Sequence, residues 1–197
     1  MPTTAPPDPP RRVHTGRRRN EEARQAILDA ALRLLTSANR GPLTVDVIAR
    51  EAGVGKQTIY RWWPSKGGVL LEALTGWSEA LVPVPDTGSL REDLRDFLRS
   101  TFRRGREPST SALLRALATE AARDPSTAGL VREFTEARRG VLRTVLERGR
   151  SRGEVAADRD LDLMVDQVYG LFWYRLLLGH APLTDEVADE LVETLTA

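Results

Sequence analysis

Three polar side chains in residues 56–63 fall on one face of a short predicted helix, at three- and four-residue spacing: Gln57, Thr58 and Arg61. A glutamine amide can pair with adenine, and an arginine guanidinium with guanine, each through two hydrogen bonds. A threonine can offer its hydroxyl, or place its methyl group against thymine. The opposite face is apolar and carries Val54, Ile59 and Trp63. The pattern predicts a helix that packs by one side and reads base edges by the other.

Further donors flank this helix, and they suit phosphate oxygens, which fix the register of a protein on a duplex without specifying sequence. They are Lys56, Tyr60, Trp62 and Lys66. Thr44, at the start of the preceding helix, adds a hydroxyl near unpaired backbone amides. The alternative for the two aromatic residues, Tyr60 and Trp62, is that they only pack between helices.

Short helices position these residues. Thr44 is expected to open one that ends at Gly53, and the turn Gly53-Val54-Gly55 leads directly into the next. A longer amphipathic helix precedes both and is expected to start at Asn20 as N-cap. This order is the signature of a helix-turn-helix unit, here predicted over residues 20–66.

The charge distribution agrees with a nucleic-acid partner. The formal charge is +1 overall, but residues 11–66 carry +7 and residues 67–197 carry −5. Lys and Arg gathered at one end attract phosphates, and an acidic body avoids the duplex. A solvated basic surface is the alternative. Residues 1–19, rich in proline and arginine, predict a disordered basic arm that either reaches a minor groove or only keeps the chain soluble.

Composition argues against several other classes of protein. The 197 residues contain no cysteine and two histidines, and they show no nucleotide-binding, zinc-protease or hydrolase motif. We therefore expect no enzyme activity, no metal site and no cofactor. The longest apolar stretch is too short to cross a bilayer and the N-terminus does not resemble a secretory signal, so no membrane association and a cytoplasmic location are expected.

The remaining sequence predicts helices throughout, giving an all-α fold of about nine helices with residues 67–197 as the second domain. Ser89 and Glu92 are expected to form a capping box. The segment 168–178 is apolar on every side except at Arg175, so both of its faces need partners. We expect one face to meet its own bundle. The other, together with the last helix, would meet a second copy as a homodimer.

The stretch Arg24 to Leu74, and above all AGVGKQTIYRWWPSK, resembles the DNA-binding domain of the TetR family of bacterial transcriptional regulators. By this resemblance, five positions match those that commonly hold DNA: Thr44, Thr58, Tyr60, Trp62 and Lys66. Gln57 and Arg61 fall where the variable base-reading residues lie. The sequence departs from the family pattern at Gly55, at the Trp62-Trp63 pair and at Gly67-Gly68. The last pair puts the rigidity of the following helix in question.

The resemblance also implies a body cavity whose occupant changes the spacing of two DNA-binding units. The candidate lining residues are Trp77, Phe97, Phe102, Leu113, Leu117, Phe134, Tyr169, Phe172, Trp173 and Arg175. Ordinary core packing is the alternative for each apolar one, and snorkelling or carboxylate pairing is the alternative for Arg175. A mostly apolar lining favours a hydrophobic effector.

Together these features predict a dimeric regulator, a repressor released from a palindromic operator by a small hydrophobic molecule. Two alternatives stay open. One is a helix-turn-helix regulator that answers no effector and whose body only dimerises. The other is a small α-helical enzyme or interaction module that binds no DNA.

Overall fold

A computed structural model describes residues 15–37, 43–78 and 84–197, and this part of the chain is α-helical without strands. Its helices are α1 (Thr15–Thr36), α2 (Val45–Glu51), α3 (Lys56–Trp62), α4 (Lys66–Ser78), α5 (Leu90–Arg106), α6 (Pro108–Ala121), α7 (Pro125–Ser151), α8 (Leu161–Leu178) and α9 (Asp185–Thr196). The all-α prediction is confirmed. In the described ranges, no helix is both long and apolar enough to cross a membrane.

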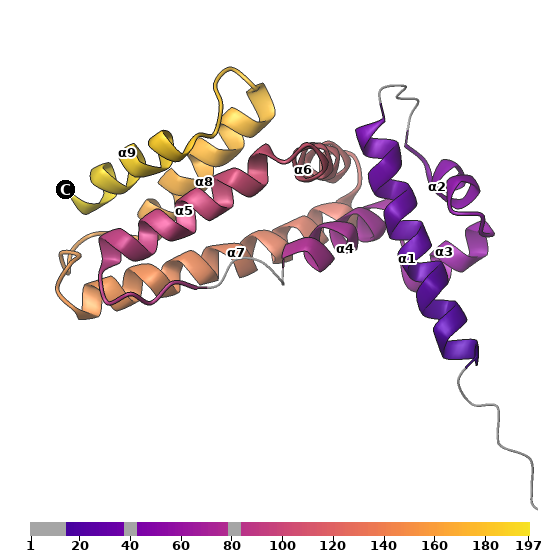
Figure 1. Cartoon of the computed structure of the whole chain (residues 1–197), viewed down its shortest axis with the longest axis horizontal. Helices are drawn as coiled ribbons and strands as arrows, with labels where there is room; N and C mark the ends of the chain where they lie inside the picture. Colours follow the sequence, from indigo (N-terminus) through magenta and orange to yellow (C-terminus); the bar gives the residue numbers. More distant parts are fainter. Residues whose placement is uncertain (1–14, 38–42, 79–83) are drawn as a thin grey trace, which may run out of the picture.

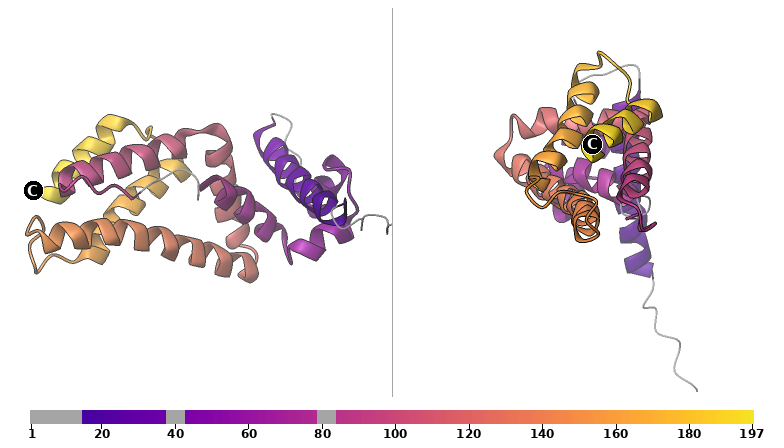
Figure 2. Two further views of the ribbon diagram at one scale, coloured as in Figure 1. Left: turned by 60° about the horizontal axis from the view of Figure 1, so that its bottom comes forward. Right: turned by 90° about the vertical axis from the view of Figure 1, so that its left-hand side faces the viewer.

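The molecule is elongated, with a small head at one end and a helical body at the other (Figure 1). Helices α1 to α3 form the head, and α5, α7, α8 and α9 form most of the body. Helices α4 and α6 lie between the two parts, as the left view of Figure 2 also shows. The head is therefore connected to the body through α4 and α6, and both helices pack against α1.

The head is held by a compact apolar core. Ile27 of α1, Ile48 of α2 and Ile59 of α3 are completely buried, and Trp63, just after α3, is 3% exposed. Gly53 has a φ of 67°, the left-handed conformation that the predicted turn requires. The helix-turn-helix geometry expected from the sequence is thus present, with α3 fixed by its buried side.

Two helix starts differ from the sequence prediction. Helix α1 begins at Thr15, so Asn20 lies inside it, and the helix takes in the last five residues of the predicted disordered arm. Residues 1–14 of that arm lie outside the described residues. At α5 the predicted capping box is wrong, because the Ser89 side chain makes no cap hydrogen bond. Instead the Leu90 N–H donates to Glu154, 2.6 Å away, a carboxylate from 64 residues later that no local pattern could reveal.

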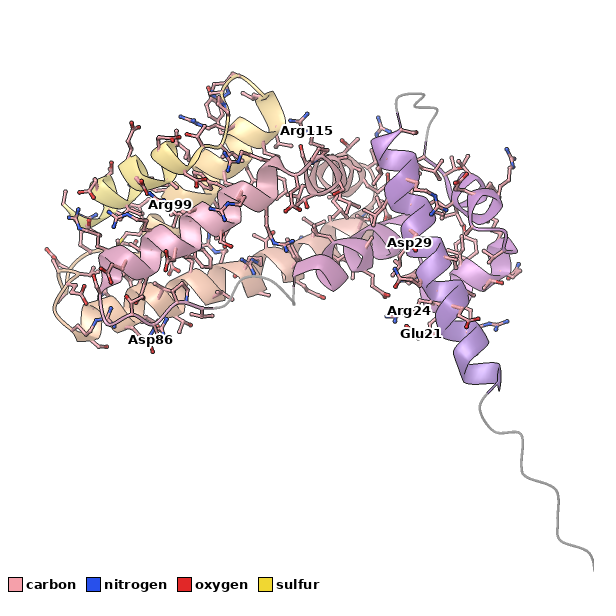
Figure 3. All side chains as sticks on the ribbon, viewed as in Figure 1. Glu21, Arg24, Asp29, Asp86, Arg99 and Arg115 are labelled. Carbon is pink, nitrogen blue, oxygen red and sulfur yellow. The ribbon has the colours of Figure 1, made fainter. Side chains whose placement is uncertain are left out.

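A row of ion pairs joins α5 to α9 along the body. Arg99 donates two hydrogen bonds to the carboxylate of Asp189, at 2.8 and 2.5 Å, and Asp185 accepts from both Arg103 and Arg106. Arg99 is labelled in Figure 3 where the two helices lie side by side. The arginine beside it lowers the pKa of the Asp189 carboxyl. Between the same helices the apolar face of α9 is buried, so the body is closed by α9 rather than leaving that face open.

Asp124 caps the N-terminus of α7. Its carboxylate accepts from the hydroxyls of Ser126 and Thr127, each at 2.6 Å, and from the Thr127 N–H at 2.9 Å. Hydrogen bonds from the Ser126 hydroxyl first, and then from Thr127, lower the pKa of Asp124 to about 2. The charged carboxylate is the better acceptor, which explains the direction of the shift.

We therefore expect Asp124→Ala to lower the melting temperature by a few degrees at neutral pH. Because the folded-state pKa lies below the unfolded value, Asp124 stabilises the fold above about pH 4, and this contribution is lost as the pH falls through about 2. Thermal unfolding followed by circular dichroism should thus show a difference between the wild-type protein and the variant that shrinks over this pH window. The exposed Asp158→Ala change is the control, and a difference that does not vary with pH would contradict the assignment.

Gly67 allows the first turn of α4 to touch the first turn of α7. A Cβ atom at position 67 would lie 2.0 Å from Oγ1 of Thr127, a residue that is completely buried and bonded to Asp124. Gly67, which the sequence alone marks only as part of a poorly helix-forming pair with Gly68, is thus required for close packing beside the head.

Gly67→Ala is therefore expected to lower the free energy of unfolding by about 1–3 kcal/mol, because overpacking outweighs the better helix propensity of alanine. Gly140→Ala on α7 is the matched control. Nothing lies within 4 Å of its added methyl group, so it should stabilise the protein by roughly 0.5–1 kcal/mol. Urea unfolding measures both, and equal effects of the two changes would refute the packing argument.

Candidate nucleic-acid interface and body cavity

Helix α3 presents its polar face to solvent. The side chains of Gln57 and Arg61 are exposed, and no hydrogen bond or ion pair within the described ranges engages either of them. Thr58 is half-buried beside them. The buried face, with Ile59 completely enclosed, prevents α3 from rotating. The predicted division of this helix into a packed face and a polar face is present in the fold.

Lys56 lies at the start of α3 and contacts both short helices. Its ammonium donates to Asp46 of α2 at 3.0 Å and lies 6.0 Å from the centre of the Tyr60 ring. The hydrogen bond to Asp46 is the main reason that the Lys56 pKa is raised, so the group carries a full positive charge at neutral pH. The side chains of Lys56 and Asp46 both remain exposed, so Lys56 is able to contact a phosphate.

The two aromatic residues differ in how they are held. Tyr60 is 45% exposed, and Trp62 is 37% exposed. The Trp62 ring is partly covered by the guanidinium of Arg24, 5.7 Å from its centre, and by Trp63, whose ring centre is 6.4 Å away. Trp62 therefore packs and faces solvent at once, whereas Tyr60 mainly faces solvent.

A network of polar contacts lies below these rings, and no pattern in the sequence predicts it. The indole N–H of Trp63 donates to Glu72 of α4 at 2.8 Å, and Glu72 also pairs with Arg24 of α1. Arg24 pairs in addition with Glu21, and both are labelled on α1 in Figure 3. These contacts tie α1 and α4 to each other and to the end of α3.

Thr44 and Lys66 are placed differently from each other. Thr44 caps α2, its hydroxyl accepting from the Val47 N–H at 3.2 Å, and it stays exposed so that its own hydroxyl proton can be donated. Lys66 points toward the body. Its ammonium lies 2.7 Å from Glu120 of α6 and 3.1 Å from the Leu43 carbonyl oxygen. In this conformation Lys66 connects the head to α6 and is not presented to an external phosphate.

The body contains a cavity of about 80 Å³ between α4, α5, α6, α7 and α8. Four of the predicted lining residues lie on it: Phe134, Tyr169, Phe172 and Trp173. Phe97, Phe102, Leu113 and Leu117 do not line it; they are 0 to 2% exposed and belong to the core, which was their alternative. Arg175 is also outside, and donates to the carbonyl oxygen of Pro182. The side chain of Trp77 lies outside the described residues.

Sequence reasoning missed the polar part of this lining, which includes Thr101, Arg104, Thr110, Thr135 and Arg138. A signal was available for Arg138. It falls four residues after Phe134 and four before Leu142, on the apolar stripe of α7, and an arginine on such a stripe is unusual. The Tyr169 hydroxyl donates to the backbone carbonyl of Arg138 at 3.1 Å, and burial raises the Tyr169 pKa.

Comparison with known proteins covers both parts of the chain. Residues 27–73 match the family model described as bacterial regulatory proteins, tetR family, and residues 84–195 match the model of the tetracyclin repressor-like C-terminal domain. The uncharacterized HTH-type transcriptional regulator YdeS of Bacillus subtilis is 34% identical over 91% of this chain and 89% of its own length.

Solved structures of regulators are also similar to this chain. The crystal structure of the TetR family transcription regulator SCO0332 is 34% identical, with a TM-score of 0.68 over 89% of this chain and 97% of that one. The flavonoid-responsive regulator FrrA is 29% identical, with a TM-score of 0.62 over 88% and 92%. Members of this family bind DNA and act as dimers. The head with its helix-turn-helix, the helical body and both family matches identify the chain as a member of the TetR family, a helix-turn-helix transcriptional regulator.

Proposed function

We propose that this regulator is a repressor that binds a palindromic operator as a dimer and leaves it when a small molecule occupies the body. The observation that carries the proposal is the exposed polar face of α3, on which Gln57 and Arg61 have no partner within the described part of the chain. Such side chains on a fixed helix can enter a major groove and pair with bases. Phosphates next to these bases are then contacted by the flanking residues Tyr60, Lys56, Thr58, Thr44 and Trp62.

Lys66 has a different role in this proposal from the one suggested by the sequence. Its ion pair with Glu120 holds the head against α6, so it sets the direction in which α3 points. A phosphate could recruit Lys66 only if that pair opened. Whether the Lys66–Glu120 ion pair is closed or open therefore affects how the head is oriented for DNA.

The second copy docks on α8. The outward side of this helix carries Leu163, Tyr174, Leu177 and Leu178, which are 57, 57, 47 and 65% exposed. With the exposed Gly170 they follow helical spacing as one stripe. An exposed stripe of large apolar side chains is typical of an interface, and twofold pairing places two heads on two half-sites. The fully buried residues of α9 pack inside the protomer, so its part in the interface is limited to residues such as Val187 and Leu191, which stay partly exposed.

The position of the cavity explains how a bound ligand would release the protein from its operator. Leu74 of α4 lines the cavity, and only three residues separate the end of α3 from the start of α4. A ligand that enlarges the cavity pushes on α4 and changes the spacing of the two heads. It shifts the equilibrium only to the extent that it binds the released conformation more tightly than the DNA-bound one. FrrA, which shares this fold, is named as flavonoid-responsive, and this supports a small organic effector here.

Selection of genomic fragments by the purified protein tests the proposal. The bound fragments should share a palindromic motif, and the affinity for it should fall steeply as salt rises, because neutralised phosphates release counterions. Weak binding that hardly changes with salt would favour a module that does not bind DNA. A motif that is bound equally with every small molecule tried would favour a regulator whose body only dimerises.

A further inference from the structure

The body cavity combines positive charge with an apolar wall. Arg104 and Arg138 line it, and no Asp or Glu does among the described lining residues. The guanidinium of Arg138 lies 5.8 Å from the centre of the Phe97 ring, and no carboxylate in the described ranges pairs with it. A partly buried arginine is normally paired with an acid or with a planar acceptor, because its charge is costly to desolvate alone. An anionic partner for the Arg138 guanidinium would therefore have to be a molecule bound in the cavity.

Thr101 is a second, independent polar group on the cavity wall that lacks a hydrogen-bond partner. Its side chain is 9% exposed, and its Oγ1 is buried without a hydrogen-bond partner. Other threonines in these helices, such as Thr119 and Thr144, bond the carbonyl four residues earlier, at 2.9 and 3.0 Å. Thr101 does not use this local option, and it lies on the cavity wall, so its hydroxyl is available to a guest.

Aromatic rings form the rest of the wall. Phe172 meets Trp173 edge-to-face, with ring centres 5.9 Å apart, and Phe134 completes this side of the cavity. Gly105 makes room for Phe172, because a Cβ atom there would lie 2.5 Å from the ring. An apolar wall facing an arginine and a hydroxyl matches a molecule with one anionic end and one apolar end.

We propose that the effector is a small organic acid whose carboxylate binds Arg138 and Thr101 and whose aromatic or short aliphatic part packs against Phe134, Phe172 and Trp173. This inference rests on the proposed effector-released function and specifies its ligand class. The cavity, at about 80 Å³, is smaller than the roughly 150 Å³ that accepts benzene in a protein interior. The acid must therefore push the lining helices apart on entry, and α4 is among them.

A matched pair of probes tests the charge requirement. Phenylacetate and phenylacetamide have the same ring and nearly the same shape, and only the first carries a charge. Isothermal titration calorimetry on the full-length protein at neutral pH should show phenylacetate binding about tenfold or more tightly than the amide. Equal affinities, or no binding of phenylacetate at millimolar concentration, would overturn the proposal.

Variants place the charge preference on named residues. Arg138→Gln should remove most of the preference for the acid, and Arg138→Lys should restore part of it. Thr101→Val keeps the shape of the side chain and should weaken phenylacetate binding several-fold. Arg132→Gln, at an exposed position of the same helix, is the control and should change nothing. Full preference for the acid in the folded Arg138→Gln variant would overturn the assignment of the carboxylate to Arg138.

A parallel assay separates this inference from the proposed function. Operator affinity is measured with and without phenylacetate at a concentration that saturates the cavity. Selective acid binding with unchanged operator affinity would support the acid site and contradict release by effector. Loss of operator binding with the amide as effectively as with the acid would support release and overturn the acid requirement.

Discussion

Replacing Leu178 of α8 with glutamate will produce monomers and weaken operator binding by about 100- to 10,000-fold, the usual gain from joining two binding modules. Leu178 is the most exposed large apolar side chain in the described part of the chain, at 65%. In a twofold interface on α8 the new carboxylate faces apolar surface, so its burial has no compensation. Each monomer would keep only one α3 and bind a half-site alone.

Sedimentation at micromolar protein concentration and a gel shift with the operator measure the two parts of this prediction. Val84→Glu is the matched control, since Val84 is also apolar and 42% exposed but lies in the segment before α5 and not on α8. The control should remain dimeric with unchanged DNA affinity. A Leu178→Glu protein that stays dimeric at these concentrations would exclude α8 as the interface.

Arg61→Ala will weaken binding to the preferred operator by about 1–3 kcal/mol, roughly 5- to 150-fold, and will relax the preference for one base pair in each half-site. The reason is that Arg61 is exposed on the polar face of α3, without a competing carboxylate in the described ranges. Loss of a bidentate pair with guanine removes discrimination at that position and leaves the others intact.

Lys56→Ala provides the contrasting variant. Lys56 reaches phosphate rather than a base in this account, so its loss should weaken all operator variants alike and lower the salt dependence by about one counterion. Binding measured against a set of single base-pair changes distinguishes the two residues. If Arg61→Ala and Lys56→Ala weaken every operator variant by the same factor, the division into base-reading and phosphate-binding residues is wrong.

The elements of this fold were largely predictable because local patterns determine them. The start of α2 at Thr44, the apolar face of α3 and the turn at Gly53 depend only on neighbouring residues, and all of them occur as predicted. Helix α8, Leu161–Leu178, is also bounded by local signals, since it begins after a capping aspartate and ends at a left-handed glycine.

The parts that the sequence could not predict depend on contacts between distant residues. Lys66 pairs with Glu120, Leu90 is capped by Glu154, and Gly67 meets Thr127. No spacing rule joins such positions, because tertiary packing alone brings them together. The same is true of the cavity, where the aromatic residues were predicted but the polar groups that would choose a ligand, Thr101 and Arg138, were not.

Methylation interference on the selected operator tests most directly whether α3 reads the major groove from a symmetric dimer. Methylation of guanine N7 blocks the major-groove edge, whereas methylation of adenine N3 blocks the minor groove. Groove reading by a symmetric dimer predicts two symmetric patches of guanine N7 interference, with their centres one or more whole helical turns apart. Interference at adenine N3 alone, or a single unpaired patch, would contradict it.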